Sequence, residues 1–261
     1  MKPSSSTPLL RVRGVAKRYG DQVALHEASF DLWPGEVLAV VGESGSGKTT
    51  LLNAIAARTT PDAGSVEFLG RDGLLQDVHT MSQAQQRLLA RTDWGFVHQN
   101  AADGLRMDVS AGANVGERLM GLGERHYGRL RCTAEEWLQR VEIDPIRIDD
   151  APRTFSGGMR QRLQIARNLV TQPRLIFMDE PTSGLDVSVQ ARLLDLMRQL
   201  TRQMHLAAII VTHDLAVARL LAHRMMVMQR GRVVEAGLTD QVLDDPQHPY
   251  TQLLVSSVLQ P

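Results

Sequence analysis

Apolar residues recur along most of the chain in short runs that alternate with stretches of helical spacing. Leu9–Val15 alternates apolar and polar residues as a half-buried strand does, and Ala24–Leu32 does so more loosely. Glu36–Val41 is a more continuous apolar run, which predicts a buried strand. It leads through a glycine-rich turn into a helix expected from about Lys48 to Ala57, and Ser65–Leu69 is expected to be a further strand.

The middle of the chain, from about residue 103 to 170, has a mostly helical pattern. Candidate helices are Asn114–Leu122, Thr133–Val141 and Met159–Val170. Gly121, Gly123 and Gly128 are expected to separate the first two. We therefore expect a helical insertion in an α/β protein.

From residue 174 the alternation of strands and helices resumes. The expected elements are a strand at Leu175–Met178, an amphipathic helix at Ser188–Gln203, a strand at Leu206–Val211, a helix at Asp214–Ala222, short strands on both sides of Arg230-Gly231, and a helical tail from Thr239 interrupted near Pro246 and Pro249. This order is typical of an α/β fold with a largely parallel sheet.

Composition narrows the class of protein. The chain has 261 residues, of which 43% are hydrophobic and 22% charged, as in a globular domain. Lys and Arg together number 29, as do Asp and Glu, so the formal net charge is +0. That balance, with 4% aromatic residues, argues against a general binder of nucleic acid or anionic membranes.

Several features indicate a cytoplasmic protein. Cys132 is the single cysteine, so no disulfide can form within the chain. No segment approaches the ~18 consecutive apolar residues of a membrane span. Met1–Leu10 contains no apolar core, so we expect no secretory signal.

The turn after Glu36–Val41 carries the strongest chemical motif. Gly42-Glu-Ser-Gly-Ser-Gly-Lys48-Thr49 matches the phosphate-binding P-loop, with a predicted strand before it and a helix after it. Glycines let the backbone N–H groups face a phosphate, and the helix N-terminus adds partial positive charge. Lys48 is expected on the β- and γ-phosphates, and the Thr49 hydroxyl on Mg²⁺.

Two later strands end in candidate catalytic residues. Asp179 and Glu180 follow an apolar run, where Asp179 can hold Mg²⁺ through water and Glu180 can act as general base on an attacking water. His213 follows the strand Leu206–Val211 and can reach the γ-phosphate if both strands are parallel.

Phe155-Ser156-Gly157-Gly158-Met159, ahead of a helix, resembles the signature motif of ATP-binding-cassette (ABC) ATPases, and the resemblance extends over nearly the whole chain. It implies a P-loop NTPase fold: an ABC nucleotide-binding domain over residues 1–261, with a RecA-like core and antiparallel β subdomain at about 9–102 and 171–238, an inserted helical subdomain at about 103–170 and a C-terminal helical tail at about 239–261.

The resemblance also assigns roles to residues. It implies ATP and Mg²⁺ as cofactors, with ATP bound by Tyr19, Gly42, Ser44, Gly45, Ser46, Gly47, Lys48, Thr49 and Thr50. Gln99 matches the glutamine that meets Mg²⁺ and the attacking water, Ser183 and Asp186 match the D-loop, and His213 matches the switch histidine. Mg²⁺ is thus expected on Thr49, Gln99 and Asp179, and catalysis on Glu180, His213 and Gln99.

Family resemblance further implies a head-to-tail homodimer, in which Ser156, Gly157 and Gly158 contact the ATP of the partner subunit. A serine and two glycines at a helix start suit a second anion site, and a symmetric pair completes both sites. The chain departs from the usual signature at Phe155 and Met159, where Leu and Gln are typical. We expect nucleotide binding to survive this change and packing or partner coupling to differ.

Within the family, Val109–Met120 and Arg125–Gly128 most resemble the ATP-binding subunits of bacterial carbon–phosphorus lyase systems. That resemblance implies docking on the lyase core complex in organic phosphonate catabolism. Arg125, His126, Arg129 and Arg131 form a local basic cluster in the helical insertion, and we expect this region, with Arg106, to contact the partner enzyme. Two alternatives stay open: the motor of an ABC importer for peptides, nickel or phosphonates, which needs a transmembrane partner, and an assembly clamp that binds ATP without cleaving it. His98, His248 and Tyr250 are interpreted as structural.

Overall fold

The computed structural model describes residues 7–258. Residues 1–6 and 259–261, which include the start of Met1–Leu10 and the end of the predicted tail, lie outside the described part. The chain divides into two compact units, and each is described by itself. Unit 1 comprises residues up to 86 together with those from 207 onward, and unit 2 comprises residues 87–206. The subdomain boundaries expected near 103 and 170 stay a prediction.

Unit 1 contains an antiparallel sheet in the order β2-β1-β4-β5. Its strands are β1 (Leu10–Tyr19), β2 (Gln22–Leu32), β4 (Ala63–Leu69) and β5 (Leu75–Asp77). β1 extends beyond the expected end at Val15, because it pairs with β2 through three register shifts as far as Tyr19 and Gln22. The predicted antiparallel β subdomain is thus confirmed.

The second group of strands in unit 1 contains the continuous apolar segment that predicted a buried strand. β3 (Val37–Val41) lies between β8 (Ala207–Thr212) and β9 (Arg224–Gln229) and is parallel to both, and β10 (Arg232–Leu238) pairs antiparallel with β9. All five β3 residues are buried, as the continuous apolar pattern predicts.

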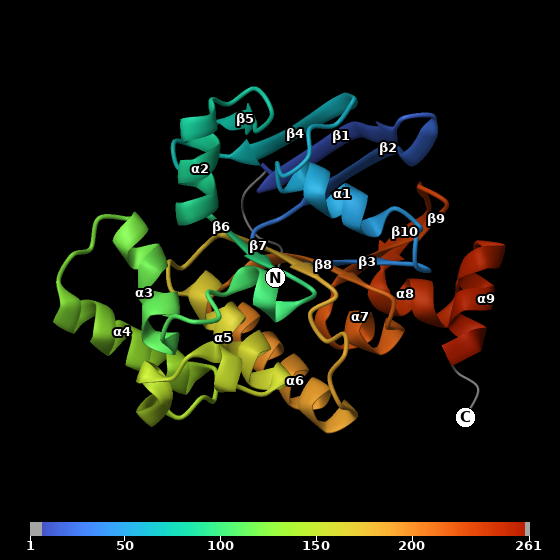
Figure 1. The fold of residues 1–261 in the computed structure, drawn as a ribbon. Coiled ribbons are helices and arrows are strands. Elements are labelled where there is room, and N and C mark those ends of the chain that lie inside the picture. Colours follow the sequence, from blue (N-terminus) through green and yellow to red (C-terminus); the bar gives the residue numbers. More distant parts are fainter. Residues whose placement is uncertain (1–6, 259–261) are drawn as a thin grey trace. The chain divides into compact units, whose positions relative to one another are not determined.

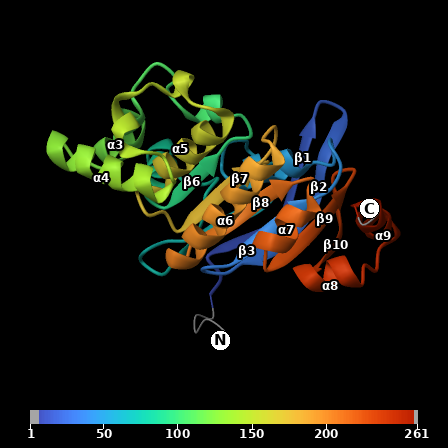
Figure 2. The same ribbon diagram turned by 90° about the horizontal axis from the view of Figure 1, so that it is seen from below.

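Helices cover both faces of these strands. α1 (Lys48–Ile55) contacts β8 on one side and the antiparallel strands β1 and β2 on the other. α7 (Leu215–Leu221) and α8 (Thr239–Asp244) lie against the opposite face (Figures 1 and 2). α9 (Pro249–Val258) follows a break at Asp245–His248, close to the interruption expected from the two prolines.

Unit 2 contains two parallel strands, β6 (Trp94–Val97) and β7 (Leu175–Asp179), and a group of helices. The helices are α3 (Ala111–Gly121), α4 (Tyr127–Arg140), α5 (Gly157–Leu169) and α6 (Val187–Gln203), with short 3-10 turns at 101–104, 145–149 and 152–154. α2 (Gln83–Thr92) crosses the boundary of the two units.

One expectation about this region was wrong. Gly128 does not separate two helices, because α4 begins at Tyr127 and contains it. His126 accepts the N–H of Arg129 through Nδ1 and caps the helix there. Every described helix is too short or too polar to span a bilayer.

Candidate functional site

The glycine-rich turn of unit 1 lies between β3 and α1, as predicted. Two of its glycines adopt conformations that a side chain would oppose, with φ of 149° at Gly42 and 100° at Gly47. A Cβ on Gly47 would lie 2.6 Å from the carbonyl oxygen of Ala24. The backbone therefore follows this path only with glycine at these positions.

Lys48 is folded back over the turn. Its ammonium donates to the carbonyl oxygens of Gly42 at 2.7 Å and Glu43 at 2.8 Å, and the residue is only 5% exposed. Ser46 is 4% exposed, and its hydroxyl oxygen has no hydrogen-bond partner within the described chain. A buried polar atom without a partner costs about 1–3 kcal/mol, so the turn holds polar groups arranged for a ligand.

The carboxyl ends of β3 and β8 bring the turn and His213 to one sheet edge. Val41 pairs with Thr212 in parallel register, so Gly42 and His213 follow their strands side by side. Asp214 accepts the N–H of Ala216 and caps α7, which fixes where the strand ends. The predicted position of His213 is confirmed, and its side chain is exposed.

Tyr19 is the last residue of β1 and lies in unit 1 as well. Its side chain is 53% exposed, and the Lys17 ammonium lies 5.6 Å from the ring centroid. An exposed aromatic ring at a strand end can stack on a planar ligand.

In unit 2 the same parallel geometry places the acidic pair. Val97 of β6 pairs with Met178 of β7, so the residues after Val97 and Met178 leave the strands at one edge. Asp179 ends β7, and Glu180 follows in a left-handed conformation with φ of 43°. Such a conformation costs a non-glycine residue roughly 1–3 kcal/mol. Five other non-glycine residues of the described chain share it, namely Ala57, Glu142, Gln172, His205 and Arg230.

Gln99 and the predicted D-loop are joined by a hydrogen bond. The Gln99 side-chain amide donates to the Ser183 hydroxyl at 3.3 Å. The N–H of Ser183 donates to the carbonyl of Glu180 at 3.1 Å, and Asp186 precedes the first residue of α6. The structure thus brings Gln99, Glu180 and Ser183 together.

Ser156 lies at the N-terminus of α5, and its hydroxyl accepts the N–H of Met159 at 3.3 Å. Gly157 and Gly158 form the first turn of the helix. A Cβ on Gly158 would overlap the side chain of Val189 in α6, so this close packing requires glycine. The start of α5 therefore presents main-chain N–H groups without side chains over them.

The sequence reasoning missed three polar residues on one face of α5. Gln164 is fully buried and makes hydrogen bonds to both main-chain groups of His98, Gln161 donates to the same His98 carbonyl, and Asn168 accepts the N–H of Phe96 at 3.0 Å. Their spacing of three and four residues on a buried helix was the available signal. They tie α5 to the strand that leads to Gln99.

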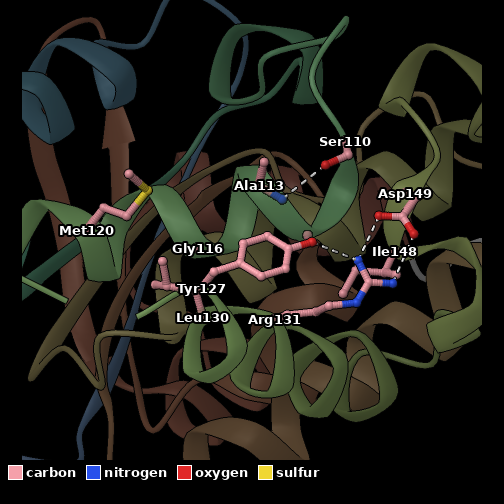
Figure 3. A pocket seen from close by; sticks show the side chains of 10 residues that line it. Ser110, Ala113, Gly116, Met120, Tyr127, Leu130, Arg131, Ile148 and Asp149 are labelled. Carbon is pink, nitrogen blue, oxygen red and sulfur yellow. Dashed lines mark hydrogen bonds and ion pairs between the residues drawn. The ribbon is translucent and has the colours of Figure 1, made fainter. Parts of the chain in front are cut away.

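Three of the four arginines proposed as a contact surface are paired with carboxylates within unit 2, whereas Arg125 donates to the main-chain carbonyls of Met120 and Glu124. Arg106 pairs with Glu117 at 2.7 Å, Arg129 with Glu124 at 2.9 Å, and Arg131 with Asp149 at 2.8 Å. Arg131 and Asp149 line one side of a pocket between α3 and α4 (Figure 3), with Tyr127 and Met120 over a floor that includes Gly116. This surface is therefore mixed in charge rather than basic.

The predicted residues fall into two sets. Tyr19, the turn 42–50 and His213 belong to unit 1, whereas Gln99, Ser156–Gly158, Asp179, Glu180, Ser183 and Asp186 belong to unit 2. Within the described residues, no three His, Cys, Asp or Glu side chains gather as a metal site. Tyr250 makes a contact that the sequence did not predict, because its hydroxyl accepts the N–H of Glu43 in the turn.

A family model and curated relatives each match most of the chain. The ABC transporter family model matches residues 25–183, and the model for the oligopeptide/dipeptide transporter C-terminal region matches residues 234–261. PhnK of Escherichia coli K12, described as a putative phosphonates utilization ATP-binding protein, is 64% identical over 97% of this chain and 98% of its own length. A putative peptide import ATP-binding protein of Brucella ovis is 37% identical over 98% of this chain and 80% of its own.

Among solved structures, the chain resembles the ATP-binding cassette MJ0796. That structure is a dimer in a post-hydrolysis state bound to ADP and Pi. The two share 28% identity with a TM-score of 0.78, over 88% of this chain and 98% of the other.

Proposed function

The chain belongs to the ATP-binding cassette (ABC) family and is an ABC ATPase, and on that premise we propose which residues bind and cleave ATP and which process the ATPase serves. Tyr19 stacks on the adenine, and the turn Gly42–Thr50 holds the phosphates. The observation that supports this most is Lys48, a buried ammonium held over the turn by two main-chain carbonyls. A phosphate replaces those carbonyls as its partner, and Ser46 gains an acceptor or donor for its hydroxyl.

We also propose a set of ligands for Mg²⁺, which follows from the resemblance to ABC ATPases. Thr49, Gln99 and Asp179 would hold Mg²⁺, which fits their chemistry because hydroxyl, amide and carboxylate oxygens are the ligands of a hard cation. Bound there, Mg²⁺ would neutralise phosphate charge. Since the Gln99 amide nitrogen donates to Ser183, the amide oxygen would be the ligand atom of Gln99.

The remaining side chains divide the work of hydrolysis. Glu180 accepts a proton from the attacking water, and Gln99 orients that water. His213 donates a hydrogen bond to the γ-phosphate, and Lys48 offsets the charge that develops on it. The position of Glu180 directly after Asp179, with its carbonyl bonded to Ser183 and Ser183 bonded to Gln99, supports a catalytic role for this residue.

We propose a head-to-tail homodimer as the working form. The α5 N-terminus, with Ser156, Gly157 and Gly158, then contacts the ATP bound by the partner subunit, while Ser183 and Asp186 lie at the interface. The dimeric state of the related cassette supports this arrangement. Size-exclusion chromatography in the presence of ATP tests this arrangement. The Glu180→Gln variant should elute as a dimer, and a variant that also carries Ser156→Arg should elute as a monomer.

We propose that the ATPase works in the cytoplasm in organic phosphonate use, docked on the carbon–phosphorus lyase core complex. The identity to PhnK over nearly both full lengths supports the process. The proposed contact is the surface that contains Arg106, Arg125, His126, Arg129 and Arg131. Affinity purification of the tagged chain from cells grown on a phosphonate should recover lyase subunits.

The importer alternative has its own support in the match of residues 234–261 to the oligopeptide/dipeptide transporter C-terminal region. Recovery of an integral membrane protein in the same purification, in place of lyase subunits, would establish that alternative. Charge reversal of both Arg129 and Arg131 should weaken lyase recovery. Unchanged recovery would remove the proposed contact surface but leave the lyase partnership standing.

A further inference from the structure

The first residue of the phosphate-binding turn after Gly42 is held from the far end of the chain. The N–H of Glu43 donates to the hydroxyl oxygen of Tyr250 at 3.0 Å, across 207 residues of sequence. The carbonyl of the same Glu43 accepts the Lys48 ammonium at 2.8 Å. Both main-chain groups of Glu43 are therefore occupied, one by a residue expected on the phosphates and the other by a residue with no assigned role.

Tyr250 is fixed independently of the turn. It is 6% exposed and packs in a buried cluster with Ala39 and Val41 of β3, Leu215 of α7 and Val227 of β9. The strand that ends in the turn is thus packed against the same ring whose hydroxyl holds the turn. A tyrosine has few rotatable bonds, so its hydroxyl is a rigid acceptor once the ring is buried.

The start of α9 is also anchored. His248 accepts the N–H of Tyr250 through Nδ1 at 3.1 Å, and the Glu235 carboxylate of β10 accepts the N–H groups of Gln247 at 2.9 Å and His248 at 3.0 Å. Burial raises the pKa of Glu235, but these hydrogen bonds, that of Gln247 foremost, lower the pKa below its ordinary value. The carboxylate form thus ties α9 to the sheet.

We propose that Tyr250 is a positioning residue for ATP binding, which acts through Glu43 and keeps the turn in the shape that phosphates require. This rests on the proposed function of Gly42–Thr50. When a phosphate draws Lys48 away from the carbonyls of Gly42 and Glu43, Glu43 keeps the N–H of Ser46 on its carbonyl, from within the turn, and the Tyr250 hydroxyl on its N–H, from outside the turn. The turn is then preorganised at no further cost in ordering.

Tyr250→Phe removes the hydroxyl and keeps the ring in the buried cluster. We expect the Kd of the full-length protein for MgATP, and the KM, to rise roughly 3- to 10-fold, the range that corresponds to one hydrogen bond, with kcat changed less than 2-fold. The matched control is Tyr127→Phe, which removes an exposed hydroxyl at 3.4 Å from Arg131 and should leave both constants unchanged. If Tyr250 had only a structural role, Tyr250→Phe would lower the fraction of active protein and kcat, and would not raise Kd and KM selectively.

Hydrogen exchange of the Glu43 amide gives a second readout that does not depend on turnover. Exchange should be faster in Tyr250→Phe and unchanged in Tyr127→Phe. Equal Kd, KM and amide exchange in Tyr250→Phe and the native protein would overturn the inference. Lys48→Ala distinguishes a failure of this inference from a failure of the proposed function. If Lys48→Ala loses ATP binding while Tyr250→Phe keeps it, only the role of Tyr250 is wrong. If Lys48→Ala binds ATP normally, the proposed nucleotide site itself is wrong.

Discussion

The guanidinium carbon of Arg147 lies 4.5 Å from the centroid of the Phe155 ring. The same guanidinium lies 3.5 Å from the sulfur of Met159 through Nη1 and donates to Asp150 through Nε at 2.7 Å. Phe155 and Met159 are the two positions at which this chain departs from the usual ABC signature, so a single arginine contacts both. The unusual residues therefore belong to one packing arrangement around the start of α5.

Arg147→Ala should destabilise this arrangement. An arginine over an aromatic ring contributes about 0.5–1 kcal/mol at exposed sites and about 2 kcal/mol when desolvated. Phe155 is buried and Arg147 is partly exposed, so we expect the free energy of unfolding to fall by about 1 kcal/mol in urea titrations. In a double-mutant cycle with Phe155→Leu, the two changes should couple by about 0.5 kcal/mol or more. Arg153→Ala, which removes an exposed arginine paired with Asp108, is the control and should change the free energy little. Additive effects of Arg147→Ala and Phe155→Leu would contradict the contact.

Lys48→Ala should abolish ATP binding. The ammonium is the one lysine group of the turn, and its loss leaves the γ-phosphate charge without its main neutralising partner. We expect ATPase activity to fall by roughly 100-fold or more, consistent with the loss of several kcal/mol of transition-state stabilisation. Thermal melting should show that the protein remains folded. A fully active variant would contradict the site.

Glu180→Gln should separate binding from hydrolysis. It keeps shape and size but removes the carboxylate proposed as base, so kcat should fall by about 10²–10⁴ while the Kd for MgATP stays near that of the native protein. Glu142→Gln is a matched control, because Glu142 also has a left-handed backbone with φ of 55° but lies away from the proposed site residues in the sequence. Persistent hydrolysis in Glu180→Gln would instead favour another base.

The pH dependence of stability should include a contribution from Glu124. The N–H of His126 and the Arg129 side chain lower the pKa of this carboxyl from 4.5 to about 2. Because the folded-state pKa is depressed, the stabilisation is present above pH 4.5 and is lost as pH falls toward 2. NMR titration of the Glu124 side chain should give a midpoint near the lower value. In Glu124→Gln the stability should vary less with pH across this window, and an equal slope in both proteins would contradict the prediction.

The elements nearest to the phosphate-binding turn could be predicted because their signals are local. Five consecutive apolar residues in β3 and the glycines after them define a strand and a turn without reference to distant segments. β6 could not be predicted, because Trp94–Val97 is too short for a periodicity and forms through pairing with β7, about 80 residues later.

α2 was missed for a different reason. Gln83–Thr92 has no buried residue, so it shows no apolar face. Its signal is a capping box, in which Ser82 and Gln85 exchange hydrogen bonds, with the Ser82 N–H donating to the Gln85 side chain at 2.9 Å. The left-handed backbone of Glu180 had no local signal at all, since it depends on the loop that follows.

The three buried polar residues of α5, Gln161, Gln164 and Asn168, link the start of this helix to the position of Gln99. The helix capped by Ser156 is hydrogen-bonded to the main-chain groups of Phe96 and His98, three residues and one residue before Gln99. We expect a displacement of Ser156 to move the segment that carries Gln99, because both are fixed to α5. If the proposed contact of Ser156 with the partner subunit's ATP forms, its formation would reposition the glutamine proposed to orient the attacking water.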